Sequence, residues 1–189
     1  MEVWKIQKAL YLLSPGDICL FNAYAFEVGQ EADFARFTKA GLGYETEIKR
    51  SLADFRADFK KAGKHEEIAS GKGNQNYFSF CFSSKELAEA AFPDIPTLYG
   101  IFYAEEKVAQ VWDGERARWA LRTSITCDRF PSKIHDRRMD WKWIAFRAGQ
   151  SYKSKVCNAL RWPDAVEPSS PPWRRMRFDP KDIPQEEPT

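Results

Sequence analysis

Apolar residues recur at helical spacing near the start of the chain: Val3, Ile6, Leu10 and Leu13. This periodicity predicts an amphipathic helix over residues 1–13, and Ser14-Pro15-Gly16 would end it. Residues 17–28 alternate poorly between apolar and polar positions, but they are rich in strand-forming side chains. We therefore expect a first strand after the helix.

Two strand-like runs follow, over residues 32–38 and 42–50, and Lys39-Ala40-Gly41 separates them. A three-residue loop with Gly at its last position favours a type I turn closed by a left-handed residue, because Gly takes positive φ without steric cost. The pattern therefore predicts a β-hairpin. A turn centred on Ala40 places Asp33 opposite Glu47, to within one residue of register.

Charged side chains share one face of the second strand of this hairpin. Because alternate side chains project together, Glu45, Glu47 and Lys49 lie on the same face. Asp33 would bring a further carboxylate against Glu47, and like charges across a ladder repel. A hard cation removes that repulsion, and Mg²⁺ binds one or two carboxylates completed by waters and phosphate oxygens. The pattern indicates a metal site, and a solvated strand face with balanced charges is the alternative.

Residues 51–62 are predicted to form a helix that packs on the sheet. Ser51 is a suitable N-cap, and Gly63 would end the helix after Ala62. The apolar positions fall on one face: Leu52, Phe55, Phe59 and Ala62. Basic residues surround that face: Arg50, Arg56, Lys60, Lys61 and Lys64. They either neutralise Asp54 and Asp58, which lie one turn apart and repel, or follow a phosphate backbone.

The middle of the chain has the pattern of a β-α-β unit. Residues 76–82 suit a central strand buried on both sides, residues 85–91 suit a short helix, and residues 98–103 suit another strand. Together with the preceding hairpin, this order fits a mixed sheet with helices on both faces. We therefore expect an α/β fold.

The last third of the chain contains a hairpin, a basic region and a tail. Asp113-Gly114 is a strong turn signal, so residues 108–112 and 116–121 are predicted to pair. Residues 127–161 are basic, and their apolar spacing indicates a helix whose charges either face solvent or contact nucleic acid. Residues 162–189 hold seven of the eleven prolines, which predicts an extended or disordered tail. We expect one domain over residues 1–161, with a core of about residues 1–121.

Composition restricts the classes of function. The net charge is only +2, so a nucleic-acid-binding face would have to come from local clustering of basic residues. The four cysteines are far apart and the histidines number two, which disfavours a zinc site and favours reduced thiols. The sequence has neither a signal peptide nor an apolar run of membrane-spanning length, so we expect a cytoplasmic protein.

Three pieces of the chain resemble the core of the PD-(D/E)XK nuclease superfamily: Asp33, Glu47-Ile48-Lys49, and residues 51–65. The third piece has the form S-x-x-D-F-x-x-D-x-K followed by a Lys-His pair, as in small bacterial and phage members similar to DNA-repair nucleases. The likeness is firm over about residues 31–65 and weak beyond residue 120. One departure is Ala32, which stands where the superfamily usually has proline before the first acid.

The resemblance implies a restriction-endonuclease-like core, a mixed β-sheet flanked by helices, that hydrolyses phosphodiester bonds in DNA during repair, DNA processing or phage DNA metabolism. It implies that Asp33, Glu47 and the backbone carbonyl of Ile48 hold Mg²⁺, for which Mn²⁺ can substitute. Lys49 would help activate or orient the attacking water. The partner would be DNA, contacted by the following residues: Arg50, Ser51, Lys60 and Lys64.

Several assignments stay open at this point. Glu2 is either a further metal-site acid, as the superfamily often has in its first helix, or a favourable charge at a helix N-terminus. Glu31 is either a ligand or a surface acid, and His65 is either a base near the metal or a structural cation. The competing hypothesis for the whole chain is a nucleic-acid-binding or regulatory protein that keeps the nuclease fold without turnover.

Overall fold

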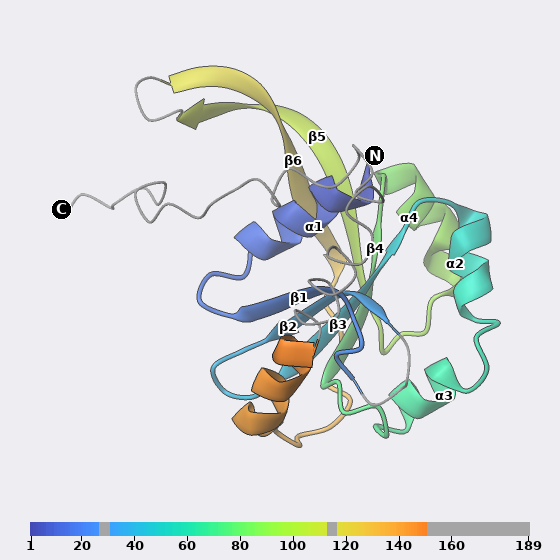
Figure 1. Ribbon diagram of the computed structural model, residues 1–189. Helices are drawn as coiled ribbons and strands as arrows, with labels where there is room; N and C mark the ends of the chain where they lie inside the picture. Colours follow the sequence, from blue (N-terminus) through green and yellow to red (C-terminus); the bar gives the residue numbers. More distant parts are fainter. Residues whose placement is uncertain (27–30, 113–116, 151–189) are drawn as a thin grey trace, which may run out of the picture.

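The computed structural model describes residues 1–26, 31–112 and 117–150. Within these residues, six strands form one mixed sheet that is flanked by helices, so the predicted α/β class is confirmed (Figure 1). The strands are β1 (Ile18–Ala23), β2 (Ala32–Phe37), β3 (Gly43–Lys49), β4 (Tyr77–Phe82), β5 (Gly100–Trp112) and β6 (Ala117–Arg129). The helices are α1 (Val3–Leu12), α2 (Leu52–Asp58), α3 (Lys64–Ala69), α4 (Lys85–Ala91) and the 3₁₀ turn η1 (Phe92–Asp94), and a further helix occupies residues 141–150.

The strands lie in the sheet in the same order as in the chain. The pairs β1–β2, β2–β3 and β5–β6 are antiparallel, whereas β3–β4 and β4–β5 are parallel. A short turn joins antiparallel strands, but parallel neighbours need a crossover connection. Helices α2 and α3 form the crossover between β3 and β4, and α4 forms the one between β4 and β5.

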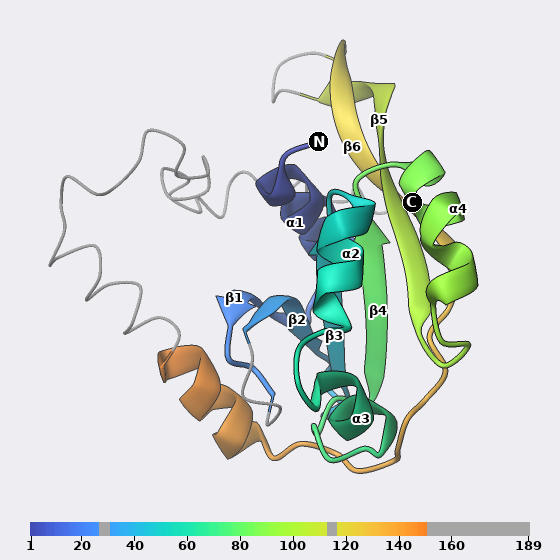
Figure 2. The ribbon, with the colours of Figure 1, turned by 90° about the vertical axis from the view of Figure 1, so that its right-hand side faces the viewer.

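Helices cover both faces of the sheet (Figures 1 and 2). On one face, Ile6 and Leu10 of α1 pack against Ile48 of β3 and Cys81 of β4. On the other face, the core includes aromatic residues of α2 and β4: Phe55, Phe78, Phe80 and Phe82. Strand β4 is therefore buried on both sides, as its sequence predicted.

The predicted helix over residues 51–62 is wrong in its second half. Helix α2 ends at Asp58, a turn follows, and α3 begins at Lys64 as a separate helix. Gly63 takes a left-handed conformation with φ of 72°, which turns the chain into α3 instead of simply ending the preceding helix. This break changes the direction in which the side chain of Lys64 points.

The two strands predicted over residues 98–103 and 108–112 are one continuous strand, β5. Its first four residues pair with β4, and its later part pairs with β6 alone. Residues 105–107 are charged and interrupt the apolar pattern, which is why the sequence predicted two strands. They lie beyond the end of β4, and their pairing with β6 continues the strand. Figure 1 shows the resulting β5–β6 arm extending from the sheet.

The predicted helical region over residues 127–161 is also corrected. Residues 127–129 complete β6, residues 130–140 are irregular, and a helix occupies residues 141–150. Ile144 of this helix is fully buried in the core. The turn at Asp113-Gly114 and the tail over residues 162–189 lie outside the described residues. Among the described helices, none combines the length and apolarity needed to cross a membrane.

Candidate functional site

The register of the β2–β3 hairpin brings Asp33 to the level of Glu47. Phe34 pairs with Thr46 and Ala35 with Glu45, so the same register continued by one residue places Asp33 opposite Glu47. Oδ2 of Asp33 accepts a hydrogen bond of 2.8 Å from the backbone N–H of Ile48. The carboxylate of Asp33 thus takes the place of a backbone partner where the ladder ends.

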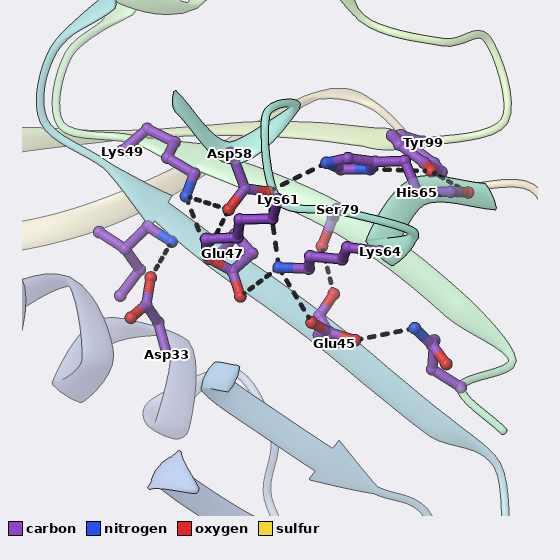
Figure 3. A network of polar contacts seen from close by, with 12 residues as sticks. Asp33, Glu45, Glu47, Lys49, Asp58, Lys61, Lys64, His65, Ser79 and Tyr99 are labelled. Carbon is purple, nitrogen blue, oxygen red and sulfur yellow. Dashed lines mark hydrogen bonds and ion pairs between the residues drawn. The ribbon is translucent and has the colours of Figure 1, made fainter. Parts of the chain in front are cut away.

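Lys49 joins the hairpin to α2. Its Nζ lies 3.0 Å from Oε2 of Glu47 and 3.1 Å from Oδ1 of Asp58 (Figure 3). Ser51 caps α2 by accepting a hydrogen bond from the backbone N–H of Asp54, which fixes the start of the helix that carries Asp58 in its last turn. The lysine of the E-x-K tripeptide is consequently held between two acids and is almost fully buried.

Lys64 is the most enclosed cation of the site. Its side chain is 0% exposed, and Nζ lies 2.9 Å from Oε1 of Glu47. It also lies 3.5 Å from Oε1 of Glu45 and 3.5 Å from Oδ2 of Asp58. The first turn of α3 therefore inserts an ammonium between three carboxylates.

Asp58 connects these ion pairs to a second line of hydrogen bonds. Its Oδ2 lies 3.1 Å from Nε2 of His65, and Nδ1 of His65 lies 3.1 Å from the hydroxyl of Tyr99. On the solvent side, Nζ of Lys61 lies 2.6 Å from Oδ1 of Asp58. Two lysines besides Lys61, together with His65, therefore surround one buried carboxylate (Figure 3).

The pKa values of the acids in this cluster are shifted in opposite directions by burial and by neighbouring charges. Burial raises the pKa of Glu45 to about 7, and the charge of Glu47 adds to the rise, against the lowering effect of Lys64. Burial and the charge of Glu47 raise the pKa of Asp33 to about 6. Burial alone would raise the pKa of Asp58, but the bond from His65 and the charges of Lys64 and Lys49 hold it far below its usual range.

The two central lysines stay charged. Burial would lower the pKa of Lys49, but the charges of Glu47 and Asp58 outweigh it and raise that pKa. Burial likewise opposes the charged form of Lys64, and its three carboxylate neighbours raise its pKa instead. Ammonium groups, not neutral amines, therefore face the carboxylates at neutral pH.

The structure brings together Asp33, Glu47 and Lys49, the residues that the sequence singled out. Arg50, Ser51 and Lys60 are exposed beside the site, and their assignment to DNA contact stays a prediction. Lys64 differs, because its buried side chain faces the carboxylates and not the solvent.

The sequence left the roles of Glu2, Glu31 and His65 open, and the structure shows where each of them lies. Glu2 is exposed and lies 3.9 Å from Lys5 of the same helix. Glu31 is exposed as well. His65 lies in the first turn of α3 and links Asp58 to Tyr99.

Sequence reasoning missed several members of the site. The sequence predicted Asp58 only as an acid that neighbouring basic residues neutralise, and Glu45 only as sharing a strand face with Glu47 and Lys49. It gave no role to Tyr99. The spacing S-x-x-D-F-x-x-D-x-K contains the signal for Asp58, because the acid lies seven residues after the N-cap, about two turns along the helix. Nothing local in the sequence indicates Tyr99, which lies directly before β5.

The oxygen atoms available for a metal come from β2 and β3. No group of three or more acidic, histidine or cysteine side chains among the described residues is arranged to hold a metal ion. Mg²⁺ needs only one or two carboxylates, however. Oε1 of Glu47 is buried, and Nζ of Lys64 lies 2.9 Å from it without a hydrogen bond of good geometry, so a metal ion would share this carboxylate with the ammonium. Asp33 is close enough for the charge of Glu47 to raise its pKa. These hard oxygen donors fit Mg²⁺.

Comparison with known proteins gives a likeness of fold. No protein-family model matches the chain, and no curated protein matches it. The chain is similar in structure to a protein of unknown function from Silicibacter pomeroyi, with a TM-score of 0.50 and 15% sequence identity. The likeness covers 85% of this chain and 89% of that one. At this identity it concerns the fold alone.

Proposed function

We propose that the protein is a metal-dependent nuclease of the PD-(D/E)XK type that hydrolyses phosphodiester bonds in DNA. The observation that carries the proposal is the convergence of Asp33, Glu47 and Lys49 at the end of the β2–β3 ladder. The order of the surrounding elements, a helix, three antiparallel strands, a helical crossover and a parallel strand, is compatible with the restriction-endonuclease-like core that the sequence resembles.

Asp33, Glu47 and the backbone carbonyl of Ile48 would hold the ion. The N–H and carbonyl of one strand residue point to the same side, and the N–H of Ile48 points to Asp33. The carbonyl of Ile48 therefore faces the same edge as the Asp33 carboxylate. When bound, Mg²⁺ lowers the pKa of a coordinated water and offsets the charge of the phosphate.

Lys49 supplies a fixed positive charge to this site. Because its pKa is raised by Glu47 and Asp58 against the effect of burial, the side chain is an ammonium at neutral pH and does not take up a proton. Its role is to donate hydrogen bonds to the attacking water or to stabilise charge that develops on the phosphate. Asp58 also holds this ammonium in place, because its Oδ1 lies 3.1 Å from Nζ.

A second candidate function is nucleic-acid binding without turnover. One observation favours it: both oxygens of Glu47 face lysines, since Oε2 lies 3.0 Å from Lys49 and Oε1 lies 2.9 Å from Lys64. A metal ion would have to share Glu47 with these two ammonium groups. If these ion pairs exclude the metal ion, the protein would bind nucleic acid without cleaving it.

Metal-dependent cleavage tests the proposal. Circular and linear DNA, single- and double-stranded, is incubated with the native protein and Mg²⁺ or Mn²⁺, beside Glu47→Gln and Lys49→Met. We expect the native protein to cut and both variants to lose at least about a hundredfold in rate, because Glu47→Gln weakens the metal site and Lys49→Met removes the positive charge at the reacting phosphate. Glu66→Gln, an exposed acid on α3, is the matched control and should cut like the native protein.

The outcomes separate the two candidate functions. Full activity in Lys49→Met, with a native circular dichroism spectrum, would contradict the nuclease assignment. Absence of cutting by the native protein, combined with equal DNA binding by native protein and Glu47→Gln without metal, would establish the binding function instead.

A further inference from the structure

The ammonium of Lys64 occupies a position of the kind that a metal ion takes in other proteins. It is fully buried, and carboxylate oxygens from three residues lie within 3.5 Å of Nζ: Glu45, Glu47 and Asp58. Carboxylate oxygens are the ligands that hard divalent cations prefer. Here the cation is part of the chain.

The contacts of Lys64 are those of a counter-ion and not of a well-formed hydrogen-bond donor. Although Nζ is 2.9 Å from Oε1 of Glu47, neither atom makes a hydrogen bond of good geometry with the described residues. The attraction is therefore mainly that of charge. Burying three carboxylates together without a cation would cost several kcal/mol for each ion, so some positive charge is needed at this point.

The charge balance of the cluster supports the same conclusion. Four carboxylates belong to it, from Asp33, Glu45, Glu47 and Asp58, and three lysines, Lys49, Lys61 and Lys64, lie against them. Lys61 is 40% exposed, whereas Lys49 and Lys64 are buried. With all four carboxylates ionised, these side chains have a net charge of −1. One divalent ion beside Asp33 would change it to +1, and a second would raise it to +3.

We propose that Lys64 is a built-in cation that takes the place of a second metal ion, so that the site accepts a single divalent ion at Asp33 and Glu47. Two-metal nuclease sites use a pair of ions about 3.5–4 Å apart to clamp the attacking and leaving oxygens. In this chain, Glu47 lies between the two cation positions, with Lys64 on Oε1. The inference rests on the proposed function, because that function places the ion at Asp33 and Glu47.

Counting bound Mn²⁺ by titration calorimetry tests this inference without measuring activity. The proteins are the native chain, Lys64→Met, and Lys72→Met as a matched lysine that is exposed on the turn after α3. We expect the native chain and Lys72→Met to bind one ion per chain. Lys64→Met should bind one ion more, because the three carboxylates around Lys64 become free to act as ligands.

Equal numbers of ions in the native chain and Lys64→Met, or two ions in the native chain, would overturn the inference. If Lys64→Met does not fold in the presence of a chelator, its refolding in Mg²⁺ becomes the readout. Recovery of the native circular dichroism spectrum with the ion supports the inference, and failure to recover with the ion overturns it.

The same proteins distinguish this inference from the proposed function. If the native chain cuts DNA and Lys64→Met gains no ion, the nuclease proposal stands and the inference of a built-in cation is rejected. If the native chain does not cut DNA and Lys64→Met gains an ion, the inference of a built-in cation stands and the nuclease proposal is rejected.

Discussion

At the scale of the single residue, Asp58 holds the cluster together. It lies within 3.5 Å of the charged nitrogens of three lysines, Lys49, Lys61 and Lys64, and bonds to His65 as well. Breaking one partner of a buried ion pair leaves the other charge without compensation, which is costly. Asp58 is therefore more important to stability than its position in a surface helix suggests.

We expect Asp58→Asn to lower the free energy of unfolding by roughly 3 kcal/mol at neutral pH, because buried lysines lose their counter-charge. Urea unfolding measures the change. Asp54→Asn is the control, since Asp54 lies one turn earlier on α2, is exposed and accepts a hydrogen bond from the backbone N–H of Arg50. A loss of equal size in both variants would show that the effect belongs to the helix and not to the cluster.

The same variant has a predicted pH dependence. The pKa of Asp58 in the folded protein is depressed by His65, Lys64 and Lys49, which outweigh burial. A carboxyl whose pKa is lower in the folded protein than in the unfolded chain stabilises the fold at pH values above its unfolded pKa of about 3.9. This contribution is lost as the pH falls toward the pKa of the folded state. The difference between native protein and Asp58→Asn should therefore shrink as the pH falls from about 5 to about 2. A constant difference over that window would exclude the electrostatic explanation.

The residues of the site differ in how far the sequence predicts them. Alternation along a strand and the centre of a turn were enough to bring Asp33 to the level of Glu47 and to place Glu47 and Lys49 on one face. The inward position of Lys64 was not predictable in this way, because it depends on the end of α2 at Asp58 and on the left-handed Gly63. The turn between α2 and α3 is too short to show an apolar periodicity from which the sequence could predict it.

At the scale of the element, the β2–β3 hairpin positions most of the site and also anchors the later chain. Its turn contains Gly41 with φ of 76°, as the sequence predicted for the last turn position. The carbonyl of Gly41 accepts a hydrogen bond of 2.8 Å from the backbone N–H of Met139. The irregular segment before the helix at residues 141–150 is thus attached to the turn that sets the register of Asp33 and Glu47.

Gly41→Ala should destabilise the protein by roughly 1–3 kcal/mol, because a left-handed residue with a side chain is strained. In addition, the new Cβ would lie 2.9 Å from the carbonyl oxygen of Met139. Thermal unfolding measures the loss. Gly149→Ala is the opposite control, since no described atom other than those of its chain neighbours and its own helix backbone lies within 4 Å of that Cβ. Alanine also favours a helix by up to about 1 kcal/mol. Equal stability of the two variants would contradict the role assigned to the turn.

Elements with regular patterns agreed with the sequence, and irregular ones did not. Helix α4 has the predicted bounds, because Ser84 caps it by accepting a bond from the backbone N–H of Leu87. Strand β5 was divided in the prediction because Glu105, Glu106 and Lys107 interrupt its apolar run. In the structure these residues lie in the arm, where pairing with β6 continues the strand without an apolar core.

At the scale of the whole molecule, the β5–β6 arm exposes apolar side chains. Val108, Trp119 and Leu121 are 65%, 73% and 69% exposed, and Val108 pairs directly with Leu121. Nearer the sheet, Ala104 and its partner Ile125 pack with α1. The apolar face that α1 covers therefore continues outward along the arm.

Replacing Trp119 by Ser and Leu121 by Thr together should change the free energy of unfolding by no more than about 0.5 kcal/mol, because exposed side chains contribute little to stability. Chemical unfolding at several protein concentrations measures this. A loss above about 1 kcal/mol that grows with protein concentration would show that the arm is buried against another copy of the chain.

The order of the strands also bears on how the protein is made. Each strand pairs with the one synthesised before it, so the sheet can lengthen strand by strand as the chain leaves the ribosome. Every side chain of the polar cluster comes from between Asp33 and Tyr99 (Figure 3). The acids and lysines can thus meet before β6 has left the ribosome, and the arm is added to a site whose charges are already in place.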